Sequence, residues 1–562
     1  MSQPQKKSTR RAWDRDQHLR ALPERVHDLV VVGGGATGCS VARDAALRGL
    51  DVCLVERSDL ASGTSSRSTR LIHGGLRYLR TWEFGFVREG LQERAILLEV
   101  APHLVRPVPF LFPAYRDRGS SRWLLRLGVG LYDALSGGRR LSPTHLLSAA
   151  TTLRLEPGLK SDGLTGSVSY TDAMTDDARL VVETGVAAVE SGATVALHVE
   201  VERIVPSDSG PAVLMLRDRL SDTTLGARAG VVINATGTWS VGIQGGRGTD
   251  GAIPSAATRL RPSRGSHLVV SREDLPVSQV VVMPSRRDGR LVFAVPAGGF
   301  TYVGTTEVDH TGPPNRVRAE AAEVDYLREV TGEVFHSGPV PRERILSTWA
   351  GLRPLIDRPG QPTPTLSRDF RIMQEAPGII SVVGGKLTSC RRMAEAAVDL
   401  AASILARRFG KRATPCITRW KLFPGAEGSL AAVTAEPIAG LDPAVSTHLA
   451  STYGSRAAKI FRGIATDPAS GVPFAPACAA TAAEVAHAVE HEGAVRLADL
   501  LFRRMHPLFI EARMTGREGR MILEAASNAM GSCLGWSEQQ RAAEIQSTLD
   551  DWAHEFCVPW AG

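Results

Sequence analysis

Three spaced glycines and the acid that follows them are the residues most suited to chemistry in this sequence. Gly33, Gly35 and Gly38 fit the spacing G-x-G-x-x-G directly after the apolar run 28–32, and the next apolar run ends in Glu56. The first glycine permits a tight turn, the second lets the backbone approach a pyrophosphate, and the third lets a helix pack closely. A carboxylate at this distance accepts hydrogen bonds from ribose hydroxyls. These residues predict a dinucleotide site without distinguishing NAD from FAD.

His73 is a candidate proton acceptor, because imidazole titrates near neutral pH. It lies in the motif Leu71-Ile-His-Gly-Gly75, where two glycines allow close approach to a planar ring. A lone histidine is more often a hydrogen-bonded structural residue. The residue type therefore leaves both roles open.

The elements that must position these residues are a strand, a turn and a helix. Small residues follow the glycine turn at helical spacing, at positions 38, 42, 45, 46 and 49. The N-terminus of such a helix presents free N–H groups and the positive end of its dipole to the phosphates. Strand, glycines, helix, strand and acid occur in the order that a nucleotide-binding βαβ unit requires.

The segment 32–49 closely resembles the opening of FAD-dependent glycerol-3-phosphate dehydrogenases of the aerobic, quinone-linked type, and so does the segment 61–79. The run 384–394 is similar to their second signature, but Cys390 stands where the family usually carries tyrosine. The resemblance therefore does not extend to the polar contact of that tyrosine. It runs from about residue 27 to about 510 in the family's order, with further matches at Asp176–Arg179, Asn234–Gly237, Gly304–Thr306, Gly351–Pro354 and Ser367–Asp369.

The resemblance implies a flavoenzyme that oxidises sn-glycerol 3-phosphate to dihydroxyacetone phosphate and passes the electrons to a membrane quinone. Such a reaction needs a base for the hydroxyl proton, cations for the phosphate and a site that excludes water. An oxidase that hands its electrons to oxygen is one alternative. A non-catalytic flavin-binding regulatory protein is another, from a different class. The catalytic residues that the resemblance implies are His73, Arg77, Tyr78, Arg353, Arg368 and Lys386.

Among the cations, Arg353 and Lys386 follow short apolar or glycine-rich segments typical of flavin-facing turns. Arginine matches phosphate oxygens with a planar fork, whereas lysine acts as a point charge. Lys386 could instead contact flavin N1–C2=O, and Tyr78 could line the pocket or pack in the core. No metal site is expected. The predicted FAD-binding residues are Gly33, Gly34, Gly35, Ala36, Thr37, Gly38, Glu56, Arg57, Thr64, Ser65, Ser66, Thr236, Gly237, Gly351, Gly385, Lys386, Leu387 and Thr388.

Composition narrows the class of protein. The 562 residues predict two or three domains, and 66 basic against 59 acidic side chains suit an anionic substrate or lipid surface. No nucleic-acid reader motif is present. Seven scattered cysteines without C-x-x-C argue against disulfide or zinc frameworks and favour a reducing cytoplasm. With no apolar run long enough to span a bilayer, we expect a cytoplasmic protein associated peripherally with the inner face of the membrane. The sequence leaves the oligomeric state open, with a homodimer as one option.

The predicted fold class is α/β, with a Rossmann-like FAD-binding domain of the glutathione-reductase/D-amino-acid-oxidase type. Short β-like runs in 265–306 indicate an antiparallel-sheet substrate domain, and the alanine-rich chain from about 420 indicates an α-helical C-terminal domain. The expected boundaries are 1–27 for a disordered basic tail, 28–103, 170–240 and 345–412 for the FAD-binding domain, 104–169 and 241–344 for the substrate or cap domain, and 413–562 for the C-terminal domain.

Residues 104–140 combine arginines, a tryptophan and an apolar body. Arg116, Arg118, Arg122 and Arg126 flank Trp123 and several leucines. Such a segment is typical of an interfacial helix that contacts anionic lipid. A helix packed on the domain, with its arginines extending toward water, fits the same pattern. Both interpretations stay open at this point.

Overall fold

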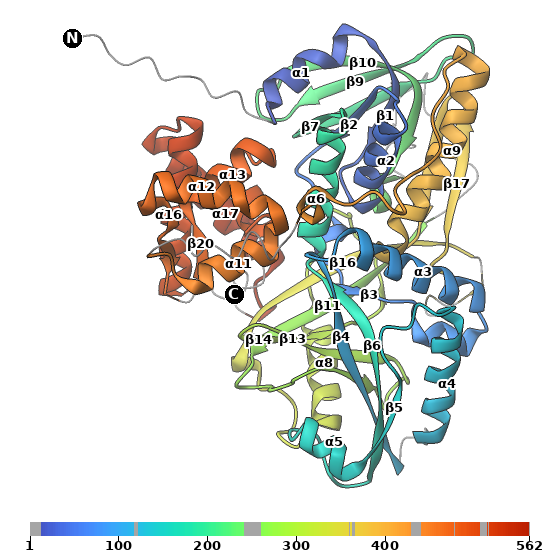
Figure 1. The fold of residues 1–562 in the computed structure, drawn as a ribbon, viewed down its shortest axis with the longest axis vertical. Helices are drawn as coiled ribbons and strands as arrows, with labels where there is room; N and C mark the ends of the chain where they lie inside the picture. Colours follow the sequence, from blue (N-terminus) through green and yellow to red (C-terminus); the bar gives the residue numbers. More distant parts are fainter. Residues whose placement is uncertain are drawn as a thin grey trace.

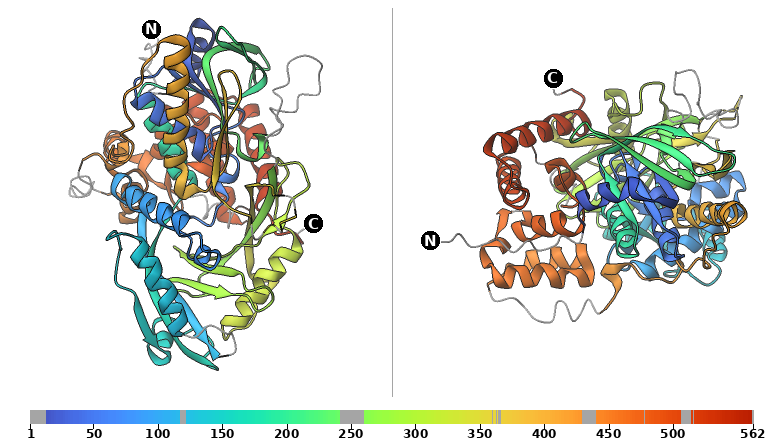
Figure 2. Two further views of the ribbon diagram at one scale, coloured as in Figure 1. Left: turned by 90° about the vertical axis from the view of Figure 1, so that its right-hand side faces the viewer. Right: turned by 90° about the horizontal axis from the view of Figure 1, so that it is seen from above.

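The computed structural model describes residues 13–116, 122–240, 260–358, 360–361, 363, 366–428, 440–476, 478–505, 514 and 516–560. Figure 1 shows three parts: one sheet at the top, a second sheet below it, and a helical body on the left in orange and red. Seen from above, the helical body lies beside both sheets (Figure 2, right).

The first sheet has the strand order β17-β18-β10-β1-β2-β7, and all neighbours except β17 and β18 run parallel. Its central strands are apolar on both faces, as expected for a parallel sheet that is covered on both sides. Its strands are β1 (Val26–Val32), β2 (Val52–Glu56), β7 (Thr194–Leu197), β8 (Val199–Val205), β9 (Ala212–Asp218), β10 (Thr224–Asn234), β17 (Phe370–Ala376) and β18 (Ile379–Gly384).

Three helices cover one face of this sheet: α2 (Ala36–Leu47), α6 (Asp177–Glu190) and α9 (Cys390–Phe409). The antiparallel strands β8 and β9 extend from β10, and their apolar side chains form a second core on the other face with helix α1 (Arg15–Glu24). The glycine turn lies between β1 and α2, at the carboxyl end of the parallel strands. This edge is where ligands bind in such folds.

The second sheet has the order β15-β11-β14-β13-β12-β4-β6-β3, and within it only β12 and β4 are seen to pair in parallel among the described residues. It contains β3 (Leu71–Ile72), β4 (Val105–Tyr115), β5 (His145–Ser148), β6 (Leu164–Thr175), β11 (Leu260–Ser271), β12 (Val280–Pro284), β13 (Leu291–Ala297), β14 (Phe300–Gly304), β15 (Val308–Asp309) and β16 (Ile345–Ile356). The helices between its strands are α3 (Phe84–Val100), α4 (Arg122–Leu135), α5 (Ala149–Leu155) and α8 (Ala321–Val334).

The C-terminal part is helical, apart from a short hairpin of β19 (Pro473–Ala475) and β20 (Cys478–Thr481). Its helices are α11 (Pro443–Tyr453), α12 (Ala457–Thr466), α13 (Ala482–His491), α14 (Leu497–Arg503), α16 (Arg517–Leu534) and α17 (Glu538–Glu555). No helix in the described ranges is both long enough and apolar enough to cross a membrane.

The tail predicted to be disordered over 1–27 is in fact folded from Trp13 onward, while residues 1–12 lie outside the described part. Helix α1 begins after Asp14, whose side chain accepts a hydrogen bond from the backbone N–H of Gln17 at 3.1 Å. Arg15 pairs with Asp218 at 2.5 Å, and Trp13 is 2% exposed. The prediction was wrong because the basic residues have partners far along the chain.

Three strands contradict the predicted domain boundaries, because each belongs to the second sheet although the prediction assigned it wholly or partly to the FAD-binding domain. β16, in the segment 345–412 assigned to the FAD-binding domain, pairs along its length with β11 of the second sheet. β3, in the segment 28–103, pairs with β6, and β6 itself extends across residue 170. The second sheet therefore takes strands from segments that the sequence pattern assigned to the FAD-binding domain.

Helix α4 packs on the domain with one side and exposes apolar side chains on the other. Val129 and Tyr132 are buried, and the Tyr132 hydroxyl donates to Asp172 at 2.7 Å. Trp123, Leu127 and Leu131 form a stripe at helical spacing on the outside and are 62%, 71% and 41% exposed. Residues 117–121 and the side chain of Arg122 lie outside the described part.

Candidate functional site

The glycine turn leaves no room for side chains at two of its positions. Gly33 has a φ of +108°, and a Cβ there would lie 2.9 Å from the carbonyl oxygen of Ala235. A Cβ at Gly38 would lie 1.8 Å from the carbonyl oxygen of Gly33. Both contacts are with backbone, so the close approach of α2 to β1 requires glycine here.

Gly35 is different, because a Cβ there would meet only Ser65 Oγ, at 3.1 Å, among the described residues. Ser65 Oγ also accepts a hydrogen bond from the backbone N–H of Ala36 at 2.9 Å. The half-buried residues Gly35, Ala36 and Thr37 thus border open space at the N-terminus of α2. Backbone N–H groups in the first helical turn have no partners within the helix, so this space suits a pyrophosphate.

Glu56 lies at the end of β2, beside the same turn. Its Oε2 accepts from the backbone N–H of Gly34 at 2.6 Å, and its Oε1 accepts from that of Ser58 at 2.8 Å. Burial raises the pKa of Glu56, and these two hydrogen bonds oppose the rise. Each carboxylate oxygen retains acceptor capacity, because it has two lone pairs. The position fits the predicted contact with a ribose.

The loop after β2 begins at the half-buried Arg57 and reaches the short helix η1 (Thr64–Ser66). Thr64 Oγ1 donates to the carbonyl oxygen of Leu352 at 2.7 Å, so η1 lies against β16. A Cβ at Gly351 would come within 2.8 Å of Arg67, which explains the small residue there. Across the turn from α2, Thr236 Oγ1 donates to Asn234 Oδ1 at 2.7 Å, and Gly237 has a φ of +58°.

Lys386, at the start of η7 (Leu387–Ser389), lies next to the predicted base. Its Nζ donates to the carbonyl oxygen of Gly74 at 3.2 Å and lies 4.0 Å from the ring centroid of Phe86. Thr388 Oγ1 is 3.4 Å from both the backbone nitrogen and the carbonyl oxygen of His73. The chain turns here through Gly384 and Gly385, which have φ values of +80° and +83°. The second signature is thereby brought against the first.

The two arginines further along the chain differ in their pairing. Arg353 donates to the carbonyl oxygen of Thr306 at 3.1 Å and to Thr305 Oγ1 at 2.9 Å. Arg368 forms an ion pair with Glu307. Burial alone would lower the pKa of Arg368, but Tyr78 and Glu307 outweigh it and the pKa is raised. Arg368 thus remains charged, with a carboxylate already beside it.

The structure places five of the six predicted catalytic residues in one connected group. Lys386 Nζ lies 5.8 Å from the ring of Tyr78, and Tyr78 lies beside Arg368. Glu307 links Arg368 to the Thr306 carbonyl that Arg353 contacts. The side chain of Arg77 lies outside the described part. Cys390 is buried, which raises the pKa of its thiol, so it does not supply a reactive thiolate.

His267 is a residue that the motifs missed. It lies in β11, stacked on Trp349 with ring centroids 4.6 Å apart, and its Nε2 is 2.9 Å from Thr69 Oγ1. Burial lowers the pKa of His267 well below its usual value, and the charges of Arg353 and Arg70 lower it further. Its Nδ1 is buried and has no hydrogen-bond partner within the described ranges. The histidine in the otherwise apolar run 267–270 was the available signal.

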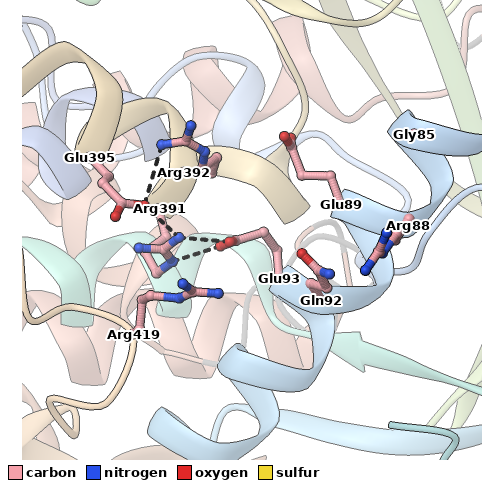
Figure 3. A pocket seen from close by; sticks show the side chains of 9 residues that line it. All are labelled: Gly85, Arg88, Glu89, Gln92, Glu93, Arg391, Arg392, Glu395 and Arg419. Atoms are coloured by element: carbon pink, nitrogen blue, oxygen red, sulfur yellow. Dashed lines mark hydrogen bonds and ion pairs between the residues drawn. The ribbon is translucent and has the colours of Figure 1, made fainter. Parts of the chain in front are cut away.

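A cavity of about 480 Å³ lies between α3 and α9. Figure 3 shows Glu89, Gln92 and Glu93 of α3 facing the arginines of α9. Arg391 donates to both carboxylate oxygens of Glu93 at 2.7 Å. The opposite face of α3 carries Gly90, where a Cβ would meet Lys386 Nζ at 2.9 Å. The cavity is thus separated by α3 from the predicted catalytic group.

Comparison with known proteins gives the family. Residues 28–400 match the family described as FAD dependent oxidoreductase, and residues 416–541 match the C-terminal domain of alpha-glycerophosphate oxidase. An aerobic glycerol-3-phosphate dehydrogenase of Staphylococcus saprophyticus is 32% identical over 96% of this chain and 97% of its own length. An alpha-glycerophosphate oxidase of Streptococcus pyogenes is 33% identical over 94% of this chain and 95% of its own.

A solved structure agrees with these matches. The glycerol-3-phosphate dehydrogenase from Bacillus halodurans, complexed with FAD, has a TM-score of 0.79 and 29% identity, covering 98% of this chain and 99% of that chain. The predicted fold class and cofactor are confirmed, and the open cradle at Gly35 fits the pyrophosphate of FAD. The chain belongs to the FAD-dependent oxidoreductases, in the branch that contains the aerobic glycerol-3-phosphate dehydrogenases.

Proposed function

We propose that this protein oxidises sn-glycerol 3-phosphate to dihydroxyacetone phosphate and passes the electrons to a membrane quinone. The substrate assignment depends on a group of three cations, Arg353, Arg368 and Lys386. They lie near the place where the second signature, 384–394, contacts the motif around His73. A phosphate dianion uses several cations better than a monoanion does. The relatives' names, which specify glycerol 3-phosphate, support the same substrate.

The proposed roles follow from position. Arg353 is held by the Thr305 hydroxyl and the Thr306 carbonyl, which leaves its fork pre-oriented for phosphate oxygens. His73 accepts the hydroxyl proton, and Lys386 holds the backbone beside it through the Gly74 carbonyl. Tyr132 of α4 accepts a hydrogen bond from the Gly74 N–H at 2.7 Å and fixes the same turn from the other side. When bound, FAD supplies the acceptor for the hydride.

Anaerobic reduction tests the activity. Addition of glycerol 3-phosphate to the purified yellow protein without oxygen should bleach its visible absorbance. Reoxidation by a quinone analogue, compared with reoxidation by air, then separates a dehydrogenase from an oxidase. Protein that keeps its colour with substrate present would instead be the non-catalytic flavin-binding protein. The oxidase is the second candidate, because a similar relative carries that name.

Removal of the proposed base should slow the reductive step strongly. We expect His73→Ala to retain flavin and to lower the anaerobic bleaching rate by on the order of 10²–10⁴, the range that loss of a general base costs. His267→Gln is the comparison, because His267 is a buried imidazole near Arg353. If His73→Ala bleaches at the wild-type rate while His267→Gln does not, the proton acceptor is His267.

The exposed stripe of α4 supports a membrane contact. We expect the protein to sediment with anionic vesicles at low salt, through Leu127 and its neighbours together with Arg126. Binding should weaken as salt rises, because the Debye length shortens from about 10 Å at 0.1 M to about 3 Å at 1 M. Cosedimentation measured across this range checks the prediction.

A matched pair of variants distinguishes binding through this stripe from non-specific adsorption to vesicles. Leu127→Glu places a charge on the stripe, whereas Leu220→Glu places one at another exposed leucine, 44% exposed in the turn between β9 and β10. Only the first should abolish vesicle binding. Wild-type protein that stays in the supernatant at low salt would contradict both the lipid surface and the quinone acceptor.

A further inference from the structure

The loop between β2 and β3 carries the predicted FAD contacts Thr64, Ser65 and Ser66, and the C-terminal domain holds this loop at two points. One point is Asp59, near its start, and the other is Arg67, just after η1. The partners of both residues come from α14 and α17 and the residues that follow these helices. More than four hundred residues separate each pair in the sequence.

The contact at Asp59 is completely buried. Asp59 is 0% exposed, and its carboxylate accepts from Arg503 Nε at 2.5 Å and from Arg504 Nη2 at 2.8 Å. Arg504 Nη2 also donates to the carbonyl oxygen of Glu492 at 2.9 Å, which ties the arginine to its own domain. Asp59 lies three positions after Glu56, and the Ala61 N–H donates to the carbonyl oxygen of Gly34 at 3.0 Å. A shift of Asp59 would therefore move the glycine turn.

The contact at Arg67 acts on a predicted FAD-binding residue directly. Arg67 Nη1 donates to Ser66 Oγ at 2.7 Å, and its Nη2 forms an ion pair with Glu555. The same guanidinium lies 4.5 Å from the ring centroid of Phe556. Phe556 is itself buried, and its carbonyl oxygen accepts from the N–H of Thr348 at 2.9 Å. The end of α17 thus orients Arg67, and Arg67 in turn holds the Ser66 hydroxyl.

We propose that the C-terminal domain is a positioning element for FAD, which keeps the loop 57–67 in its binding geometry through Asp59 and Arg67. A loop that is ordered before its ligand arrives binds more tightly, because the ordering cost is met on folding. Buried ion pairs suit this task better than they suit net stability, since the desolvation of their charges offsets much of their attraction. The proposal rests on the predicted FAD contacts of Thr64–Ser66 and is independent of the substrate.

Two ion pairs between the same domains give a matched test. Glu555 pairs with Arg67, with side chains 33% and 7% exposed, and Glu190 of α6 pairs with Arg456, with side chains 47% and 5% exposed. Only the first pair touches the loop. We expect Glu555→Gln to weaken FAD binding by about tenfold, or about 1.4 kcal/mol, and Glu190→Gln to leave it unchanged. The measurement is titration of the apoprotein with FAD, followed by flavin fluorescence.

Arg504→Lys tests the second point, because it keeps the charge at Asp59 but removes the planar fork. We expect faster release of FAD from this variant, with far-UV circular dichroism unchanged. If Arg504→Lys fails to fold, the comparison of Glu555→Gln with Glu190→Gln alone tests the proposal. Equal FAD affinity in Glu555→Gln and wild type, or an equal loss in Glu555→Gln and Glu190→Gln, would overturn the proposal. In either case the contacts only join the two domains.

Discussion

Arg353→Ala should lower kcat/KM for glycerol 3-phosphate by roughly 30- to 150-fold, since loss of a charged hydrogen-bond partner costs about 2–3 kcal/mol. The guanidinium is pre-oriented by the Thr305 hydroxyl and the Thr306 carbonyl, so its removal leaves the substrate phosphate without a fixed partner. Steady-state rates with a soluble electron acceptor measure the effect. Arg353→Lys should recover little, because an ammonium cannot reproduce both hydrogen bonds and still face the phosphate.

Glycerol is the control substrate, because it has the alcohol but lacks the phosphate. Wild-type turnover of glycerol should be very slow, and Arg353→Ala should change it far less than it changes turnover of glycerol 3-phosphate. Equal losses on both substrates would show that Arg353 acts at the reacting alcohol or at the cofactor. The neighbouring His267, whose pKa the Arg353 charge helps to lower, would then be the group to examine next.

Gly35→Val should yield folded but colourless protein. A Cβ at Gly35 would meet only the Ser65 Oγ among the described residues, at 3.1 Å, so we expect the fold to adjust to a side chain that fills the space predicted for the pyrophosphate. Gly38→Ala is the contrasting variant, because its Cβ would lie 1.8 Å from the carbonyl oxygen of Gly33. Such overpacking typically costs about 1–3 kcal/mol and moves the backbone.

Two measurements distinguish these variants. Visible flavin absorbance reports cofactor content, and thermal unfolding of the apoprotein reports the fold. Gly35→Val should lose colour with little change in the apoprotein Tm, whereas Gly38→Ala should lower the Tm itself. Full flavin content in Gly35→Val would refute the placement of the pyrophosphate at this turn.

The nucleotide-binding turn could be predicted from the sequence because its chemistry is local. Glycines, strand, helix and acid lie within about thirty residues, and each has a physical requirement that shows in its type. The strands β1 and β2 and the helix α2 lie where the apolar runs and the small residues at helical spacing predict them.

The features that could not be predicted from the sequence pattern depend on partners that are distant along the chain. Helix α1 looked like a solvated tail, because Asp218, which pairs with Arg15, lies about two hundred residues away. His267 looked like one residue of an apolar strand, because Thr69 and Trp349 reach it only in the folded chain. β16 carries a motif of the cofactor site, yet eleven of its residues pair with β11 in the other sheet.

The parallel partner β10 of β1 is synthesised long after β1 itself, because it lies far along the chain. Val30 pairs with Val232, and Val232 in turn pairs with Ile379, so the sheet closes only when the chain has passed that point. At typical elongation rates of about 5–20 residues per second, this edge of β1 lacks its partner β10 for on the order of tens of seconds. Until then β1 has only β2 as a partner, and its other edge stays open and prone to aggregation. We expect the yield of active protein to depend on chaperones and on translation speed more than its folded stability would suggest.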